Sequence, residues 1–165
     1  MTLKGNAAPM TETERILDQL KRAYQGGAWH GPSVRETLSG VPAEMAAARP
    51  ISAAHSIWEV VLHIAAWEAA VGRRLKGDRA QLPSEEDWPR VIDTSEAAWG
   101  EAKKALEQSH DSLVAAVSGL DETKLDEPIL AEMSSIYVTL HGVIQHDLYH
   151  AGQIAILKKA LGIAG

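Results

Sequence analysis

The 165-residue chain contains no cysteine and no phenylalanine. Without cysteine it can form neither disulfides nor thiolate metal sites, so histidine and the carboxylates are its only strong metal ligands. No stretch approaches the roughly 18 consecutive apolar residues of a membrane span, which predicts no membrane association. Residues 1–6 hold one lysine and no apolar segment of the kind found in secretory signals, so we expect a cytoplasmic protein.

An excess of positive charge is also missing, because 16 Lys and Arg face 22 Asp and Glu for a net charge of −6. The first 82 residues carry 10 basic and 8 acidic side chains, and the remainder carries 6 and 14. Nucleic-acid-binding proteins concentrate positive charge to displace counterions from phosphates, so we expect no nucleic-acid partner. The length and the 45% hydrophobic content indicate a single domain over residues 1–165, with residues 1–10 expected to be flexible.

Four long segments show apolar residues at helical spacing, and Gly, Pro and Asp separate them. Their cap and stop residues predict helices over about 11–26, 52–76, 94–119 and 134–162. The connection over 28–52 is rich in Gly and Pro and is predicted to be long, with a short helix near 33–38. Alternating β-type runs are absent from the sequence, which indicates an all-α protein and a four-helix bundle.

The strongest chemical signal is the pair His146 and His150 in the last predicted helix. A spacing of four residues places both rings on one helical face, where one divalent ion can bridge them. The same face is apolar, so both rings point into the bundle; the alternative interpretation is that each is a hydrogen-bonded core histidine. His63 lies on the inward face of the second predicted helix and is a candidate third ligand. Three imidazoles with open positions are typical of a catalytic or substrate-binding metal site.

Two carboxylates are candidates for a supporting or catalytic role beside these histidines. Glu59 lies between His55 and His63 in an i, i+4, i+8 series, so it is either an outer acceptor or extra ligand, or a surface carboxylate. Asp147 is the second candidate, because it follows His146 directly. The sequence assigns neither as a general base.

The remaining aromatic and histidine residues carry weaker signals. Trp67, and Trp29 from the long connection, are candidate walls of an apolar pocket over the metal, although a tryptophan is more often part of the core or a loop anchor. We expect His141 to be structural or at the surface, and His30 and His110 to face solvent.

Two blocks, residues 54–68 and 140–154, resemble the DinB/YfiT-like superfamily of metal-binding four-helix bundles. The first contains Ser-Ile-Trp-Glu at 56–59 ahead of a helical histidine, and the second contains His-x-x-x-His followed by Gly-Gln-Ile at 152–154. The Asp-Trp-Pro loop at 87–89 and the Ala-Arg-Pro-Ile run at 48–51 are also similar. Ala151 departs from the family pattern, where many members carry arginine.

The resemblance implies an up-down-down-up bundle with a long loop between its first two helices. Carried over residue by residue, it implies that His63, His146 and His150 bind a divalent ion, zinc or nickel, and that the protein forms a homodimer. It also implies a small-molecule substrate and either a metal-dependent hydrolase or an S-transferase that uses an external low-molecular-weight thiol.

Three functional hypotheses therefore stand at the level of sequence. The first is an enzyme whose three-histidine metal activates water or a thiol. The second is a non-catalytic stress protein that binds a metal or a small ligand. The third is a structural helical dimer with core histidines and no metal.

Overall fold

The computed structural model of the chain describes residues 9–79 and 81–163. The predicted all-α fold is confirmed, and in the described residues the only β pairing is an isolated bridge between Pro128 and Ser135. In chain order the elements are α1 (Glu12–Gln25), α2 (Val34–Thr37), α3 (Ala43–Ala47), α4 (Ile57–Arg74), α5 (Ser84–Asp87), α6 (Glu96–Ser118), the 3-10 helix η1 (Glu122–Lys124) and α7 (Ile136–Ala160).

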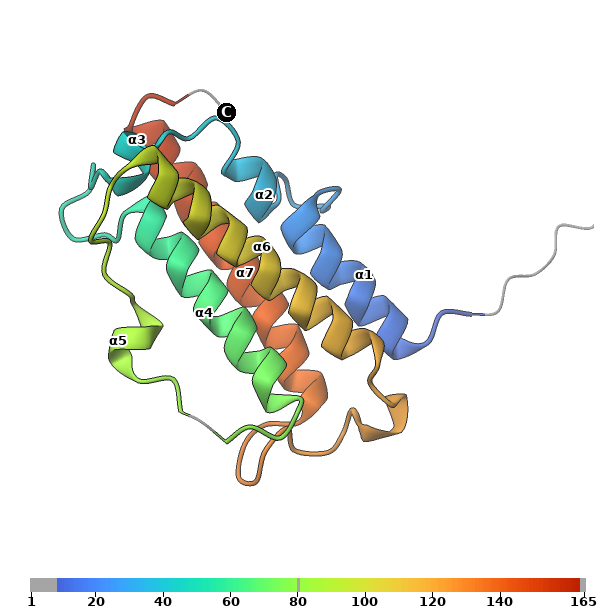
Figure 1. Cartoon of the computed structure of the whole chain (residues 1–165). Coiled ribbons are helices and arrows are strands. Elements are labelled where there is room, and N and C mark those ends of the chain that lie inside the picture. The colour runs from blue at the N-terminus through green and yellow to red at the C-terminus, as the bar shows by residue number, and fades with distance from the viewer. Residues whose placement is uncertain (1–8, 80, 164–165) are drawn as a thin grey trace, which may run out of the picture.

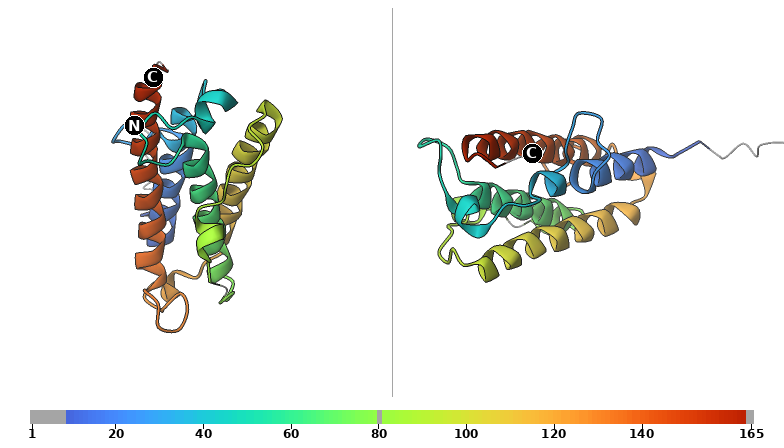
Figure 2. Two further views of the ribbon diagram at one scale, coloured as in Figure 1. Left: turned by 90° about the vertical axis from the view of Figure 1, so that its left-hand side faces the viewer. Right: turned by 90° about the horizontal axis from the view of Figure 1, so that it is seen from above.

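The four long helices α1, α4, α6 and α7 form the bundle (Figure 1). α4 packs against both α6 and α7, and α1 also packs against both of them. The colour gradient in Figure 1 shows α1 and α7 running one way and α4 and α6 running the other way. Figure 2 shows the same helices side by side, with the α5 segment lying against α4.

Side-chain caps fix where these helices begin. Thr11 and Ser56 each form a capping box with the glutamate three residues later, which satisfies backbone N–H groups that the first turn leaves free. Ser95 caps α6 and Ser135 caps α7 by accepting from the N–H three residues on. The short helix expected near 33–38 is α2, with Ser33 as its N-cap. α4 begins later than the predicted residue 52, because its capping box starts at Ser56.

The bundle interior is apolar, with two packed clusters at its two ends. Its largest fully buried side chains include Trp99, Ile57 and Ile64 in one cluster and Leu113 and Leu140 in the other. Several ionisable groups are nevertheless buried among them, namely His63, Glu68, His110, Asp147, His150 and Lys158. No helix in the described part of the chain is both long enough and apolar enough to cross a membrane. Residues 1–8 of the segment that was expected to be flexible lie outside the described residues.

Candidate metal centre

Three histidine rings from two helices meet inside the bundle. His63 comes from α4, and His146 and His150 come from consecutive turns of α7. Their ring centroids are 4.4 to 4.8 Å apart, and one nitrogen of each lies within 4.8 Å of the others. His63 and His150 are buried and His146 is half-buried. The structure therefore brings together the three residues that the sequence predicts as ligands.

A backbone carbonyl fixes the proton on His63. Its Nδ1 lies 2.7 Å from the carbonyl oxygen of Asp87 and 3.1 Å from the Asp87 carboxylate. A carbonyl oxygen only accepts hydrogen bonds, so Nδ1 carries the proton and donates it. The lone pair of Nε2 is then free to accept a proton or to bind a metal, which is the usual arrangement of a metal-binding histidine.

His150 is oriented in the same way by a residue one turn further along α7. Its Nδ1 donates to the side-chain oxygen of Gln153 at 2.7 Å, which leaves Nε2 with its lone pair. Burial disfavours the charged ring and lowers the pKa of His150 to about 4, with the nearby His146 as the next cause. At neutral pH the His150 ring is therefore uncharged, and its Nε2 can bind a metal ion.

The third ring, His146, shows best whether these residues fit a metal ion. Its Nε2 lies 2.9 Å from Nε2 of His63. With both rings neutral, Nε2 of His63 accepts and His146 carries its own proton on Nε2. The buried Nδ1 of His146 is then left with no hydrogen-bond partner among the described residues. A cation held by both Nε2 atoms would move that proton to Nδ1, which faces Oδ1 of Asp147 at 3.7 Å. The residues present thus fit a divalent ion.

Asp147 belongs to a buried polar cluster that lies behind the three histidines. Its carboxyl group is fully buried against the Glu68 carboxyl group, and burial raises the pKa of both. Glu68 in turn contacts α6, because its Oε1 lies 2.9 Å from Nδ1 of His110 and its Oε2 accepts from Ser109 at 3.1 Å. Asp147 is therefore placed to support His146 rather than to contact a molecule in a solvent-connected cavity.

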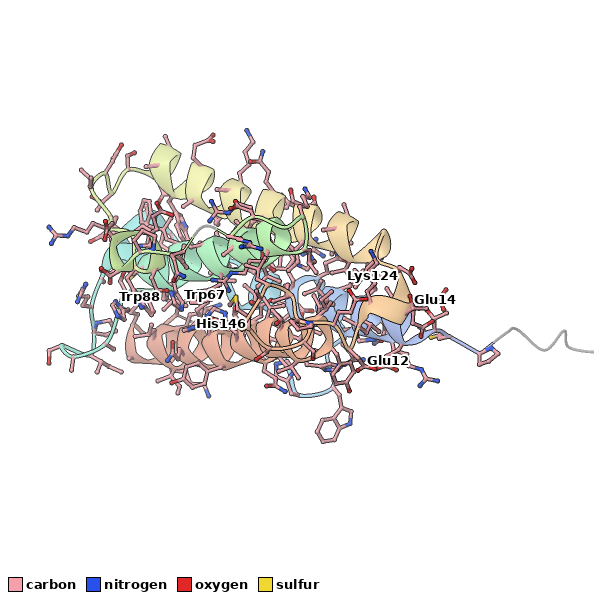
Figure 3. The ribbon with its side chains drawn as sticks, turned by 90° about the horizontal axis from the view of Figure 1, so that it is seen from below. Glu12, Glu14, Trp67, Trp88, Lys124 and His146 are labelled. Carbon is pink, nitrogen blue, oxygen red and sulfur yellow. The ribbon has the colours of Figure 1, made fainter. Side chains whose placement is uncertain are left out.

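The histidines are held from the loop side by Asp87 and Trp88, to which the sequence assigned no role. Trp88 is stacked between His63 and His55, with ring centroids 3.8 and 3.6 Å away and nearly parallel planes. The Asp87 carboxylate accepts from the indole N–H of Trp67 at 2.7 Å. Figure 3 shows Trp67, Trp88 and His146 gathered between the ribbons of α4 and α7. The Asp-Trp-Pro loop was visible as a family feature, but nothing in its spacing indicates which atom would reach His63.

The structure gives Glu59 no contact with His63, His146 or His150. Its carboxylate accepts from the backbone N–H of Ser56 and pairs with Arg49, and it lies 3.7 Å from Nδ1 of His55. These contacts lower its pKa against the opposing effect of burial, which is the largest single contribution. Of the two sequence alternatives, the contacts favour a capping and surface ion-pair role.

Two expectations from the sequence are wrong. Trp29 is fully exposed and does not line a cavity at the histidines, because the α1–α2 connection carries it to the surface while α4, α5 and α7 surround the site. His110 is fully buried rather than solvent-facing, because its position on α6 falls on the inward stripe with Leu106 and Leu113. His30 is exposed as expected, and His141 is half-buried against the ring of Tyr137.

Two cavities flank the histidines. The larger, of about 560 Å³, reaches His63 and His150 and is bounded by Trp88, Tyr149 and Ile156. The smaller, of about 290 Å³, reaches His146 and is bounded by Trp67 and Arg74, among others. The larger cavity is of the size that accommodates a small organic molecule, so a ligand can approach the nitrogen donors directly.

A comparison with family models matches the DinB superfamily over residues 18–154. This range contains all three histidines, Asp87, Trp88 and Gln153. No curated protein and no solved structure matches the chain. Because the match covers most of the sequence and the bundle is the one expected, the chain belongs to the DinB superfamily.

Proposed function

We propose that His63, His146 and His150 together bind one divalent metal ion, with zinc or nickel as the expected metals. The observation that carries the proposal is the direction of the protons. Two rings donate from Nδ1 to fixed oxygens. The third has a buried Nδ1 that could carry a proton facing Asp147 only if its Nε2 no longer gave its own proton to His63, as when Nε2 binds a cation. Neutral imidazoles that are oriented in this way suit zinc, nickel, copper and iron.

We further propose that this site belongs to a metal-dependent enzyme with a small-molecule substrate. A divalent ion there would lower the pKa of a bound water or thiol, so that either could attack an electrophile at neutral pH. The chain would contribute the orientation of its imidazoles and a largely apolar cavity beside them. A thiol would come from outside, since the sequence has no cysteine. Hydrolysis and S-transfer are both open to such a site.

One observation favours the alternative of a non-catalytic protein that binds a metal or small ligand. The two carboxylates considered as general bases both have other roles, because Glu59 caps α4 and Asp147 is buried behind His146. His55, at the edge of the larger cavity, is the remaining side chain there that can accept a proton without serving as a ligand. Turnover of an electrophile by the unmodified protein, in water or with an added thiol, would favour the enzyme. Its loss in His55→Phe, which keeps a flat ring against Trp88, would assign the proton transfer to His55. The homodimer implied by the family stays a prediction.

Elemental analysis tests the metal site. Tag-free protein purified without added metal, then incubated with zinc or nickel, should hold about one equivalent per chain. The His63→Ala/His146→Ala double variant should hold none. His141→Ala serves as the matched control because it removes a half-buried histidine from the same helix α7 without touching the three rings. Absence of metal from the unmodified protein after incubation would refute the proposed function.

A further inference from the structure

The larger cavity has the imidazoles of His63 and His150 at one end, and its walls carry no formal charge. Among the described residues that line it there is no Lys, Arg, Asp or Glu. Its walls are mainly aliphatic and aromatic, formed by Ile51, Val60, Trp88, Ile156 and Leu157. Ile51 and Ile156 are exposed at 42% and 60% and stand where the cavity meets solvent.

Most polar side chains of this cavity already contact other parts of the protein, and Tyr149, which also lines it, adds a hydroxyl group and no cationic side chain. Gln153 accepts from His150, and His63 donates to the loop carbonyl. His55 stacks on Trp88 at the rim, where Glu59 faces it at 3.7 Å, and the charge of Glu59 is met by Arg49. A charged group on a ligand body would therefore lose its hydration here without finding an opposite charge, which is costly.

The smaller cavity differs on this point. It reaches the same three histidines through His146, but Arg74 lines it, with its guanidinium 5.5 Å from the ring centroid of Trp67. An anionic ligand body would find a cation there. At about 290 Å³ against about 560 Å³, however, it offers roughly half the space.

We propose that the larger cavity selects molecules with an uncharged, largely apolar body and a single metal-binding end. This rests on the proposed metal site, because the donor end needs the ion held by the three histidines. The metal-binding atom of the ligand contacts that ion, while the rest of the molecule contacts the walls formed by Trp88, Ile156 and Leu157. The selected class is then neutral aromatic or aliphatic compounds, and carboxylated analogues are rejected.

The test uses the protein loaded with Co²⁺, whose visible absorption reports both the metal site and thiolate binding. The two probes are 4-mercaptobenzamide and 4-mercaptobenzoate, which have nearly the same shape and differ in the charge at the far end. They are titrated at about pH 8, where an ordinary histidine is uncharged. We expect the benzamide to bind at least about 10-fold more tightly than the benzoate.

Two lysine variants on α7 locate the binding. Ile156→Lys adds a cation at the mouth of the larger cavity. It should reduce or reverse the preference for the benzamide over the benzoate. Gln145→Lys adds the same charge to an exposed position on the same helix outside both cavities, and should leave the preference unchanged. An effect of equal size in both variants would refute binding in the larger cavity.

The outcomes separate this proposal from the one on which it rests. Failure of the protein to bind about one equivalent of Co²⁺ before any thiol is added refutes the metal site itself. Normal Co²⁺ binding with equal or tighter binding of the benzoate overturns the selection for uncharged bodies. If that tighter binding is lost in Arg74→Gln, the ligand body belongs in the smaller cavity. Normal Co²⁺ binding with no thiolate band from either probe also overturns the proposal.

Discussion

Replacing Glu68 by glutamine should change how the stability of the fold depends on pH. The Glu68 carboxyl group is fully buried, and burial raises its pKa from 4.5 to about 8. The folded chain thus keeps a proton that the unfolded chain releases. The stability that Glu68 contributes is complete below pH 4.5 and is lost as the pH rises towards 8.

His110 acts in the opposite direction but over a lower range of pH. Burial lowers its pKa from 6.5 to about 4, so the unfolded chain binds the extra proton between these values and stability rises with pH there. Above pH 6.5 the contribution of His110 is constant and that of Glu68 still falls. One proton changes the free energy of unfolding by about 1.4 kcal/mol per pH unit. Because of Glu68, the free energy of unfolding should therefore fall by about 2 kcal/mol as the pH rises from 6.5 to 8. The adjacent Asp147 adds to this fall, since burial raises its pKa too.

Urea unfolding followed by far-UV circular dichroism measures this effect, with a chelator present so that metal binding does not contribute. The unmodified chain should lose stability over pH 6.5 to 8, and Glu68→Gln, which keeps the shape of the side chain, should lose about 2 kcal/mol less. Glu101→Gln, at a side chain 77% exposed on α6, should follow the unmodified chain. Identical pH dependence in Glu68→Gln and the unmodified chain would show that Glu68 does not hold a proton in the fold.

The other predictions concern the metal centre and the exposed tryptophan. His146→Leu should abolish metal binding, and in zinc at 100 times its dissociation constant the variant should lack about 2.7 kcal/mol of metal-linked stability, measured by urea unfolding. Asp87→Ala removes the acceptor of Trp67 and one contact of His63, so metal affinity should fall about 10- to 100-fold in competition with a chromogenic chelator. Trp29→Ser should change stability by no more than about 0.5 kcal/mol and leave the metal content unchanged, because the side chain is fully exposed.

The periodic part of the fold could be predicted from sequence because each long helix buries one stripe. Both ends of α6 and both ends of α7 lie within two residues of their predicted limits, because the N-caps and the glycines after the last turn are local sequence signals. α4 was predicted five residues too early at its start, because Ser52 and Ser56 are both possible caps and only Ser56 has a glutamate three residues later. α3 and α5 span four or five residues, too few to show a period.

The polar interior could not be predicted, because polar residues are normally assigned to the surface. His110 lies between Ser109 and Asp111 in the middle of the third predicted helix and was expected to face solvent, although it shares the inward stripe of α6. Its partner Glu68 follows Trp67 on α4, and a glutamate is rarely buried without a partner. Each residue looks like a surface residue by itself, and only their pairing across two helices makes both burials possible.

The candidate ligands and their orientation depend on different kinds of information in the chain. Two rings are recognisable because a four-residue spacing on one helix brings them together whatever the loops do. The proton on His63, in contrast, is fixed by a backbone carbonyl at residue 87, whose position depends on the path of the α4–α6 connection. No side-chain spacing encodes that path. Metal affinity should therefore respond to changes in this connection that leave the four long helices intact, because the helices set where the nitrogens lie and the connection sets which of them carries the proton.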